Sequence, residues 1–320
     1  KRHFKRMKNL RVAVVGAGYL GRFHAQKYRM LKNVTLIGVC DLNSTIGQSV
    51  AQECATEFFS DHTLLANKVD AVTISASTSA HFDLARFFLE RGVHVLLEKP
   101  MTVTSQEGAN LTKLADDNDL KLQVGHVERF NPALLAAKKR LNDVQFIECH
   151  RLAPFKVRGA EVNVVLDLMI HDLDVILSLV GGKPINVSAV GIRVLTDNID
   201  IANARIEFDT GAVANVTSSR VSQNTQRKFR VFQHKQYLSI DFEAGDLSLI
   251  TYGDSAKTDE GTLKNERWSL KKEDALLAEV RSFTESILEN RPCQVPGLEG
   301  VLALELAETI MDTIDYSVAS

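Results

Sequence analysis

Over its first 126 residues the chain alternates short apolar runs with longer segments of helical spacing. The apolar runs are rich in β-branched residues and are too short for buried helices, which is typical of strands inside a parallel sheet. We expect these strands at residues 11–15, 34–40, 69–77, 93–100 and 120–126. Strand–helix–strand repeats predict a doubly wound parallel sheet with helices on both faces and right-handed crossovers.

Three glycines follow the first strand with the spacing G-x-G-x-x-G: Gly16, Gly18 and Gly21. A strand precedes them, a helical pattern follows, and Asp41 ends the second strand. This context separates a dinucleotide-binding turn from an ordinary glycine-rich turn. We expect Gly16 to permit the tight turn, Gly18 to admit a pyrophosphate, and Gly21 to let the helix pack on the sheet. The helix N-terminus then meets the phosphates.

The charge of Asp41 bears on which dinucleotide binds. Its carboxylate can accept hydrogen bonds from the adenosine ribose and would repel the additional phosphate of NADP. The sequence therefore favours NAD over NADP. Arg22 and Lys27 remain open as phosphate contacts.

The second half follows a different pattern. Asn131-Pro132 predicts a helix start, residues 144–152 a strand and residues 164–180 a mostly buried helix. Six strand-like runs between residues 185 and 252 predict a large, open, mostly antiparallel sheet, with an exposed loop at 253–267 and helices at 275–290 and 300–317. We predict a Rossmann domain at 9–125 and an α+β domain at 126–320, leaving open that the C-terminal helices pack back on the first domain. The uncovered sheet face favours a homodimer or homotetramer.

Composition excludes several classes of function. The 320 residues carry a net charge of -2, with 45% hydrophobic residues, so neither nucleic acid nor an anionic membrane is expected as a partner. The four cysteines form no C-x-x-C pair, which argues against zinc and dithiol chemistry and fits a reducing, cytoplasmic compartment. We expect no metal and no membrane span, and we exclude the basic residues 1–8 from fold reasoning.

Two sets of residues are candidates for catalysis. Lys99, in Glu98-Lys99-Pro100, ends a parallel strand at the sheet edge where ligands bind. A lysine there can stabilise an alkoxide or accept a proton, although a surface lysine before a turn is an equal alternative. Asp167 and His171 lie four residues apart on the 164–180 helix, with Asp174 three further on. A carboxylate one turn away orients an imidazole for proton transfer near neutral pH.

Four basic residues near residues 125–159 are candidates for holding an anionic substrate: Arg129, Arg151, Lys156 and Arg158. Solvated surface charge explains them equally well. His81 either lines the cofactor pocket or is a plain helix-terminus histidine.

Taken in order, GAGYLG, Asp41, SASTSAH, EKP and the D-x-x-x-H of DLMIHD resemble the Gfo/Idh/MocA family of NAD(P)-dependent oxidoreductases. The resemblance implies catalysis by Lys99 and by an Asp167–His171 pair, and a cis Lys99-Pro100 bond. The cofactor residues that it implies are Gly16, Gly18, Tyr19, Leu20, Gly21, Asp41, Ser75, Ser77, Thr78, His81, Glu98 and Lys99. The substrate residues are Lys99, Arg129, Arg151, Arg158, Asp167 and His171. Ser77 stands where the family often has proline, and DLMIHD lacks the glycines that often flank the family's histidine.

Within the family, GHVERFNP, RLAPF and VVLDLMIHDLD look most similar to the subgroup that oxidises UDP-N-acetylglucosamine at C3. That subgroup's keto product passes to an aminotransferase on the route to lipid A. Dehydrogenases of inositol, of other sugars or of UDP-hexuronates are the alternatives within the family. A non-catalytic NAD-sensing regulator is the alternative from another class, and it would not need Lys99 with Asp167 and His171.

Overall fold

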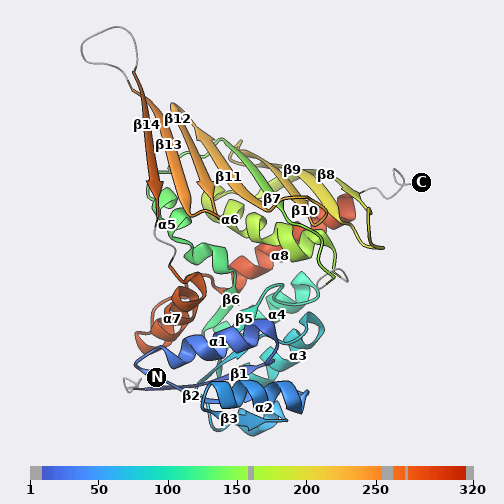
Figure 1. The fold of residues 1–320 in the computed structure, drawn as a ribbon, viewed down its shortest axis with the longest axis vertical. Helices are drawn as coiled ribbons and strands as arrows, with labels where there is room; N and C mark the ends of the chain where they lie inside the picture. Colours follow the sequence, from blue (N-terminus) through green and yellow to red (C-terminus); the bar gives the residue numbers. More distant parts are fainter. Residues whose placement is uncertain (1–8, 158–161, 254–261, 271–272, 315–320) are drawn as a thin grey trace. The chain divides into compact units, whose positions relative to one another are not determined.

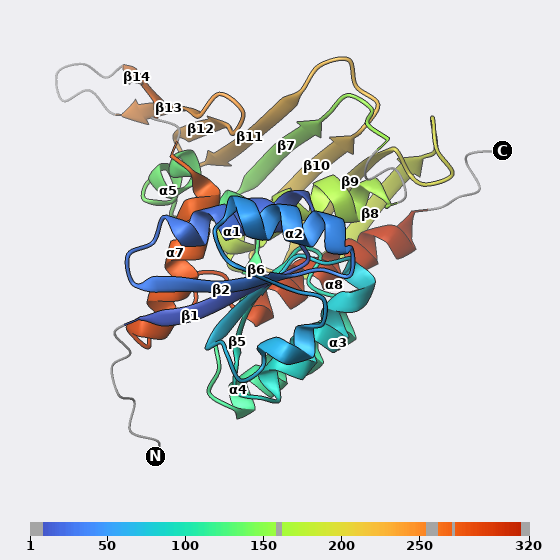
Figure 2. The same ribbon diagram turned by 60° about the horizontal axis from the view of Figure 1, so that its bottom comes forward.

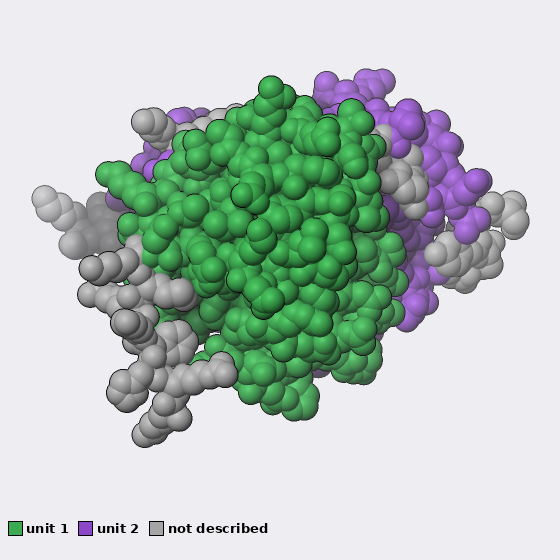
Figure 3. Space-filling model, turned by 90° about the horizontal axis from the view of Figure 1, so that it is seen from below, with its two compact units in different colours: residues 1–127, 274–301 green, residues 128–273, 302–320 purple. Residues whose placement is uncertain are grey.

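The computed structural model describes residues 9–157, 162–253, 262–270 and 273–314, which are drawn as the coloured ribbon in Figure 1. The chain forms two compact units, coloured separately in Figure 3: residues 1–127 with 274–301, and residues 128–273 with 302–320. Among the described residues, no helix combines the length and apolarity that crossing a membrane requires.

The first unit contains a parallel sheet of six strands in the order β3-β2-β1-β4-β5-β6. This is the strand order of a doubly wound dinucleotide-binding fold, so the predicted fold class is confirmed. The strands are β1 (Leu10–Val15), β2 (Val34–Cys40), β3 (Glu57–Phe59), β4 (Ala71–Ile74), β5 (His94–Glu98) and β6 (Leu122–Gly125). The sequence pattern did not single out β3, because its three residues are too few to show a period.

Helices cover both faces of this sheet. Figure 2 shows α1 (Tyr19–Arg29) and α2 (Ser44–Glu53) on one face, with α3 (Thr78–Leu89) and α4 (Ser105–Asp117) on the other. The 3-10 helix η1 (His62–Leu65) precedes β4, and α7 (Ala275–Leu288) packs against α1. Val280 and Phe283 of α7 join Ala25 and Tyr28 of α1 in one apolar core.

Local capping signals place two helix starts where the sequence predicted them. Thr104 accepts a hydrogen bond from the backbone of Glu107, whose side chain returns to the Thr104 N–H, completing the capping box of α4. Asn131 caps α5 (Pro132–Lys138), with its side chain accepting the N–H of Ala133 at 3.0 Å. Both signals depend only on neighbouring residues, so the sequence is sufficient to predict them.

The second unit is built on an eight-stranded sheet in the order β14-β13-β12-β11-β7-β10-β9-β8. Its strands are β7 (Phe146–Leu152), β8 (Pro184–Ile192), β9 (Ile201–Phe208), β10 (Val213–Ser219), β11 (Gln226–Gln233), β12 (Gln236–Asp241), β13 (Asp246–Gly253) and β14 (Thr262–Ser269). Neighbouring strands are antiparallel except β7 and β10, which run parallel. The large, mostly antiparallel sheet that the sequence predicted is therefore confirmed.

One face of this sheet packs under helices, and the other carries both polar side chains and the aromatic rings of Phe146, Phe232 and Tyr237. The helices are η2 (Val127–Phe130), α5, the π-helix η3 (Val165–Met169), α6 (Ile170–Val180) and α8 (Gly297–Thr313), whose first residues belong to the first unit. Met169, Leu173 and Ile310 pack with Ile147 and Phe229 of the strands. On the opposite face, Arg230 pairs with Glu148 at 2.7 Å and Asn203 donates to Thr217 at 2.8 Å.

The prediction of a loop over 253–267 was wrong for residues 262–267, which belong to the edge strand β14. The segment TLKNERWS has only two large apolar residues, Leu263 and Trp268, on opposite sides of the strand, so it lacks the apolar alternation by which a strand is recognised. Backbone pairing with β13 along its whole length defines it instead. Charged side chains on an edge strand also disfavour pairing with another chain.

Candidate active site

The glycine turn after β1 needs glycine at Gly16 and Gly21. Gly16 has φ +92°, and a Cβ built on it would lie 2.6 Å from the backbone nitrogen of Ala76. A Cβ on Gly21 would lie 1.7 Å from the Gly16 carbonyl oxygen. Backbone contact at this distance excludes any side chain, so the turn and α1 approach each other as the motif predicts.

Gly18 differs from the other two glycines because a Cβ built on it would meet nothing within 4 Å. It is the N-cap of α1, and no side chain of the described residues caps that helix. Tyr19 and Leu20 follow it with 61% and 37% of their surface exposed. Open space beside uncapped N–H groups at a helix N-terminus suits a pyrophosphate, so these residues fit NAD.

Asp41 supports this turn from the end of β2. Its carboxylate accepts the N–H of Ala17 at 2.6 Å and that of Asn43 at 2.7 Å. The side chain is half-buried, so each oxygen also retains acceptor capacity. Asp41 therefore fixes the glycine turn through hydrogen bonds that the motif alone did not predict.

Arg22 and Lys27 both have carboxylate partners within the first unit. Arg22 lies 2.7 Å from Glu53, and Lys27 lies 2.6 Å from Asp274.

The segment after β4 packs against the glycine turn. Ser75 donates its hydroxyl to the Gly16 carbonyl at 2.8 Å. Ser77 is exposed at the N-cap of α3, and Thr78 is half-buried. His81 is 1% exposed, with Nδ1 at 3.0 Å from the Pro100 carbonyl and Nε2 at 3.1 Å from that of Ala76. Burial lowers the pKa of His81, and its ring connects the Ser75–Ser77 loop to the segment that follows Lys99.

Lys99 directly follows β5 and is half-buried, with a cis peptide bond to Pro100 as the resemblance implied. Its neighbour Glu98 is buried, with one carboxylate oxygen 2.6 Å from Nε2 of His24 on α1 and the other accepting the Lys99 N–H at 3.2 Å. The expectation that Glu98 contacts the cofactor is therefore not supported, because its carboxylate is occupied inside the unit.

In the second unit, Asp167 lies in η3 and His171 in the first turn of α6, both half-buried. The π-helix adds a residue to the turn on which Asp167 stands, a feature that the sequence does not reveal. Such single π-turns are frequent at functional sites. A four-residue separation remains close to one turn, so the two side chains stay on one side of the helix.

Asn163 begins the helix that carries Asp167. Its side chain accepts the N–H of Val165 at 2.9 Å, and its carbonyl accepts the N–H of Asp167 at 3.0 Å. An asparagine before an apolar run is the signal by which the sequence could have identified this cap.

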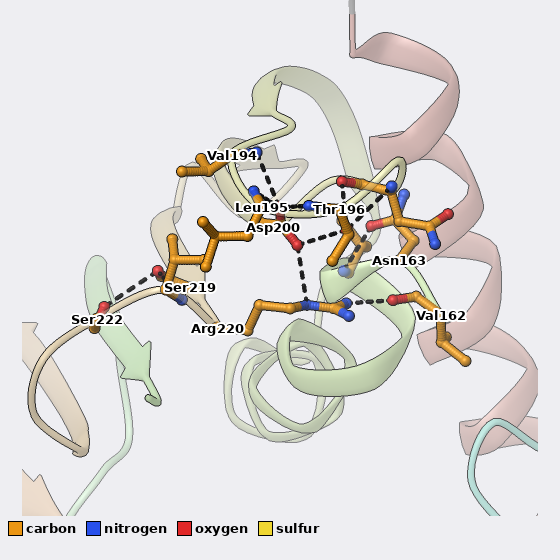
Figure 4. Close-up of polar contacts among 12 residues, drawn as sticks. Val162, Asn163, Val194, Leu195, Thr196, Asp200, Ser219, Arg220 and Ser222 are labelled. Atoms are coloured by element: carbon orange, nitrogen blue, oxygen red, sulfur yellow. Dashed lines mark hydrogen bonds and ion pairs between the residues drawn. The ribbon is translucent and has the colours of Figure 1, made fainter. Parts of the chain in front are cut away.

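A network around Asp200 holds the chain just before this cap (Figure 4). Asp200 accepts the N–H groups of Val194, Leu195 and Thr196 at 2.9, 2.6 and 2.9 Å. Burial raises the pKa of Asp200, but these hydrogen bonds outweigh it and lower the pKa to about 2. Arg220 lies 3.8 Å from Asp200 and donates to the Val162 carbonyl. No local signal marks Arg220, because its contacts with Asp200 and Val162 join segments far apart in the sequence.

The two described arginines of the expected anion clamp lie in buried ion pairs. Arg129 is 6% exposed and pairs with Asp174 at 3.0 Å. Arg151 is 5% exposed and contacts both oxygens of Asp172 at 2.9 Å and Glu128 at 3.1 Å. Both guanidinium groups neutralise carboxylates inside the unit, so these pairs do not support the expected clamp.

Asp174, three residues after His171, is 2% exposed, and its Oδ1 accepts a hydrogen bond from Arg129. Lys156 is exposed, and Arg158 lies outside the described residues.

Comparisons with known proteins agree over nearly the whole chain. A model described as "Oxidoreductase family, NAD-binding Rossmann fold" matches residues 10–126, and one described as "GFO/IDH/MocA C-terminal domain" matches residues 136–239. UDP-N-acetylglucosamine 3-dehydrogenase from Acidithiobacillus ferrooxidans is 38% identical over 302 residues, covering 94% of this chain and 96% of that protein. A solved structure of that enzyme superposes with a TM-score of 0.90 at 36% identity, covering 96% of this chain and 98% of that one.

Inositol dehydrogenases are also similar, at lower identity. The NAD(+)-dependent scyllo-inositol 2-dehydrogenase of Bacillus subtilis is 30% identical over 67% of this chain and 68% of that protein. The structure of a scyllo-inositol dehydrogenase from Lactobacillus casei, with bound NAD(H) and scyllo-inositol, has a TM-score of 0.80 at 19% identity, covering 96% and 97%. At that identity the likeness shows a shared fold alone.

Proposed function

Because the chain belongs to the Gfo/Idh/MocA family of NAD-dependent oxidoreductases, we propose that it oxidises the C3 hydroxyl of UDP-N-acetylglucosamine to a ketone. The observation that carries this proposal is the 38% identity to a UDP-N-acetylglucosamine 3-dehydrogenase across 94% of this chain. The inositol dehydrogenase of Bacillus subtilis matches at 30% over only 67% of the chain.

The chemistry needs a hydride acceptor, a proton acceptor and a group that stabilises negative charge on oxygen. Bound NAD supplies the hydride acceptor. We propose that His171 accepts the proton of the substrate hydroxyl and that Asp167 orients its imidazole. Lys99 then stabilises the negative charge that develops on the hydroxyl oxygen. His171 and Asp167 share one side of a helix, and Lys99 ends β5 directly beside the buried Glu98, which supports this assignment.

The diphosphate of the substrate needs donors other than the two buried arginines. Arg129 and Arg151 are each at most 6% exposed and pair with carboxylates. Among the described basic residues of this region, Lys156 is exposed. The case for a sugar nucleotide therefore rests on the relative and not on an arginine clamp.

The resemblance also suggests partners and a location. We propose that the chain forms homodimers or homotetramers through the open face of the second unit's sheet, where Arg230 and Glu148 pair. The 3-keto product is a substrate for an aminotransferase, as in the lipid A route that the subgroup resemblance implies. Four free cysteines, three of them buried, fit a reducing cytoplasm.

The test is NADH formation with UDP-N-acetylglucosamine against myo-inositol, glucose and a UDP-hexuronate, each at matched concentrations. An aminotransferase and an amino donor remove the keto product, because alcohol oxidation by NAD is often uphill. Turnover confined to UDP-N-acetylglucosamine supports the proposal. Turnover with myo-inositol alone would agree with the family but would exclude UDP-N-acetylglucosamine as the substrate.

A further inference from the structure

Three titratable side chains gather in the interior of the first unit: His24 on α1, Glu98 at the end of β5 and Glu279 on α7. Their exposed fractions are 0%, 6% and 0%. One nitrogen or carboxylate oxygen of each lies within 4.8 Å of those of the other two. Ionisable groups are rarely buried unless they are paired, so the cluster needs an explanation beyond packing.

The backbone around Glu98 is shaped to admit its carboxylate. A Cβ built on Gly125, the last residue of β6, would lie 2.9 Å from the carboxyl carbon of Glu98. Any residue other than glycine at this position of β6 would displace the Glu98 side chain. The site is therefore built by two adjacent strands and two helices.

The geometry indicates a hydrogen-bonded pair and not a set of metal ligands. Nε2 of His24 and Oε1 of Glu98 are 2.6 Å apart. Two ligands of a tetrahedral zinc ion, each about 2.1 Å from the metal, are roughly 3.4 Å apart. Burial alone raises the pKa of Glu98, but the hydrogen bond and charge of His24, with the charge of Lys99, outweigh it and lower the pKa.

The second oxygen of Glu98 connects this pair to the candidate catalytic lysine. It accepts the backbone N–H of Lys99 at 3.2 Å, and so holds the peptide from which the lysine side chain extends. The other oxygen contacts the imidazole of His24. His24 lies three residues after Gly21 on α1, the helix that begins at the glycine turn. One carboxylate thus joins the helix of the cofactor turn to Lys99.

We propose that His24 and Glu98 are positioning residues that fix Lys99 relative to the cofactor turn, a role that rests on the proposed function of Lys99. Glu279 adds a second carboxylate to the same interior.

The experiment compares Glu98→Gln with wild type in steady-state turnover, NADH binding and thermal unfolding. Glutamine keeps the size and an acceptor oxygen, but it removes the charge that His24 matches. We expect kcat to fall roughly 10- to 100-fold, the scale that about 1 Å of misplacement causes, with KM and the Kd for NADH within about threefold of wild type. His24→Gln should lower kcat similarly.

Tyr28→Phe is the matched control. Tyr28 is also on α1 and is fully buried. Its hydroxyl forms a 2.6 Å hydrogen bond with Thr73, which is not a member of the His24–Glu98 pair. Its loss should lower Tm without lowering kcat at a temperature where the protein is folded. Equal losses of kcat in Tyr28→Phe and Glu98→Gln at equal Tm would overturn the proposal, because a general loss of stability would then explain both.

A double-mutant cycle separates this inference from the proposed function. If Glu98 acts through Lys99, Glu98→Gln has little further effect on residual turnover in Lys99→Ala. An undiminished effect in that background would overturn the positioning role. Wild-type turnover by Lys99→Ala itself would instead reject the proposed function. Stoichiometric zinc in the purified protein, lost in Glu98→Gln, would replace the hydrogen-bonded pair with a metal site.

Discussion

The two units bring their candidate functional residues into place by different means. In the first, the glycine turn is fixed by backbone contacts so close that Gly16 and Gly21 admit no side chain. In the second, the helix of Asp167 and His171 begins at a cap. The segment just before that cap accepts a hydrogen bond from Arg220, which in turn lies beside Asp200. Local backbone geometry fixes the glycine turn of the first unit. Side-chain contacts between segments far apart in the sequence hold the start of the Asp167 helix in the second.

This difference explains where mutations should act. A backbone turn tolerates changes to its exposed neighbours but none at its glycines. A network of buried charges is sensitive at every member, because removing one partner leaves another buried charge uncompensated.

The largest effect should follow substitution of the proposed proton acceptor in the second unit. His171→Ala removes the imidazole, and we expect kcat to fall roughly 10²- to 10⁴-fold. The Kd for NAD should not change, because the glycine turn lies in the other unit. Steady-state turnover and NADH fluorescence titration measure the two quantities. The exposed His234, also in the second unit, provides the control His234→Ala, which should keep wild-type kcat. Equal turnover by both variants would exclude His171 from the mechanism.

The next largest effect tests whether Arg151 is a structural partner or a substrate clamp. Arg151→Met leaves Asp172 and Glu128 without their shared cation, and we expect the free energy of unfolding to fall by about 3–5 kcal/mol. Denaturant unfolding measures this loss. Arg205→Met breaks an exposed pair with Glu207 and should cost at most about 1 kcal/mol. A folded Arg151→Met with wild-type stability but a raised KM for UDP-N-acetylglucosamine would restore the clamp that the sequence suggested.

The Arg151 and Arg129 pairs also show why sequence reasoning failed in part. The glycines, Asp41, the Thr104 cap and the Asn131 cap depend on residues close in sequence or on a motif of fixed spacing, and the structure contains all of them. The partners of Arg129 and Arg151 are 45 and 21 residues away. Nothing in a single sequence distinguishes a buried arginine with such a partner from one that awaits a phosphate.

The edge strand β14 and the π-turn at Val165–Met169 were missed for related reasons. A strand with one large apolar residue on each side has no hydrophobic period, and a π-turn inserts a residue without changing composition. The placement of Lys99, Asp167 and His171 on a strand end and one helix was predictable. The hydrogen bonds that hold those elements, through Glu98 and Asp200, were not.

A smaller, pH-dependent effect tests the network around Asp200. The pKa of Asp200 is lowered from 3.8 to about 2, because three backbone N–H groups donate to the carboxylate. The folded protein therefore binds this proton less tightly than the unfolded chain. The stabilisation, about 2 kcal/mol, is present above pH 4 and is lost as the pH falls towards 2.

Asp200→Asn should remove this contribution. Denaturant unfolding of wild type and variant between pH 2 and 7 should give two curves that converge at the acid end and separate by about 2 kcal/mol at neutral pH. A constant separation at every pH would show that the charge of Asp200 contributes nothing, and that the loop is held by shape alone.

The smallest effect concerns Asp41, whose side chain supports a glycine turn that is otherwise fixed by backbone contacts. Asp41→Asn removes the charge that disfavours the additional phosphate of NADP, and it also replaces one of two acceptor oxygens that hold Ala17 and Asn43. Both cofactors use the same glycine turn, so damage to the turn weakens both equally and cancels in the ratio of their Kd values. The ratio therefore isolates the charge, and we expect it to shift towards NADP by roughly tenfold, or about 1.4 kcal/mol. Titration of the variant with NADH and NADPH measures it. If both Kd values rise and the ratio stays constant, Asp41 acts only as a support for the turn, and the preference for NAD arises elsewhere.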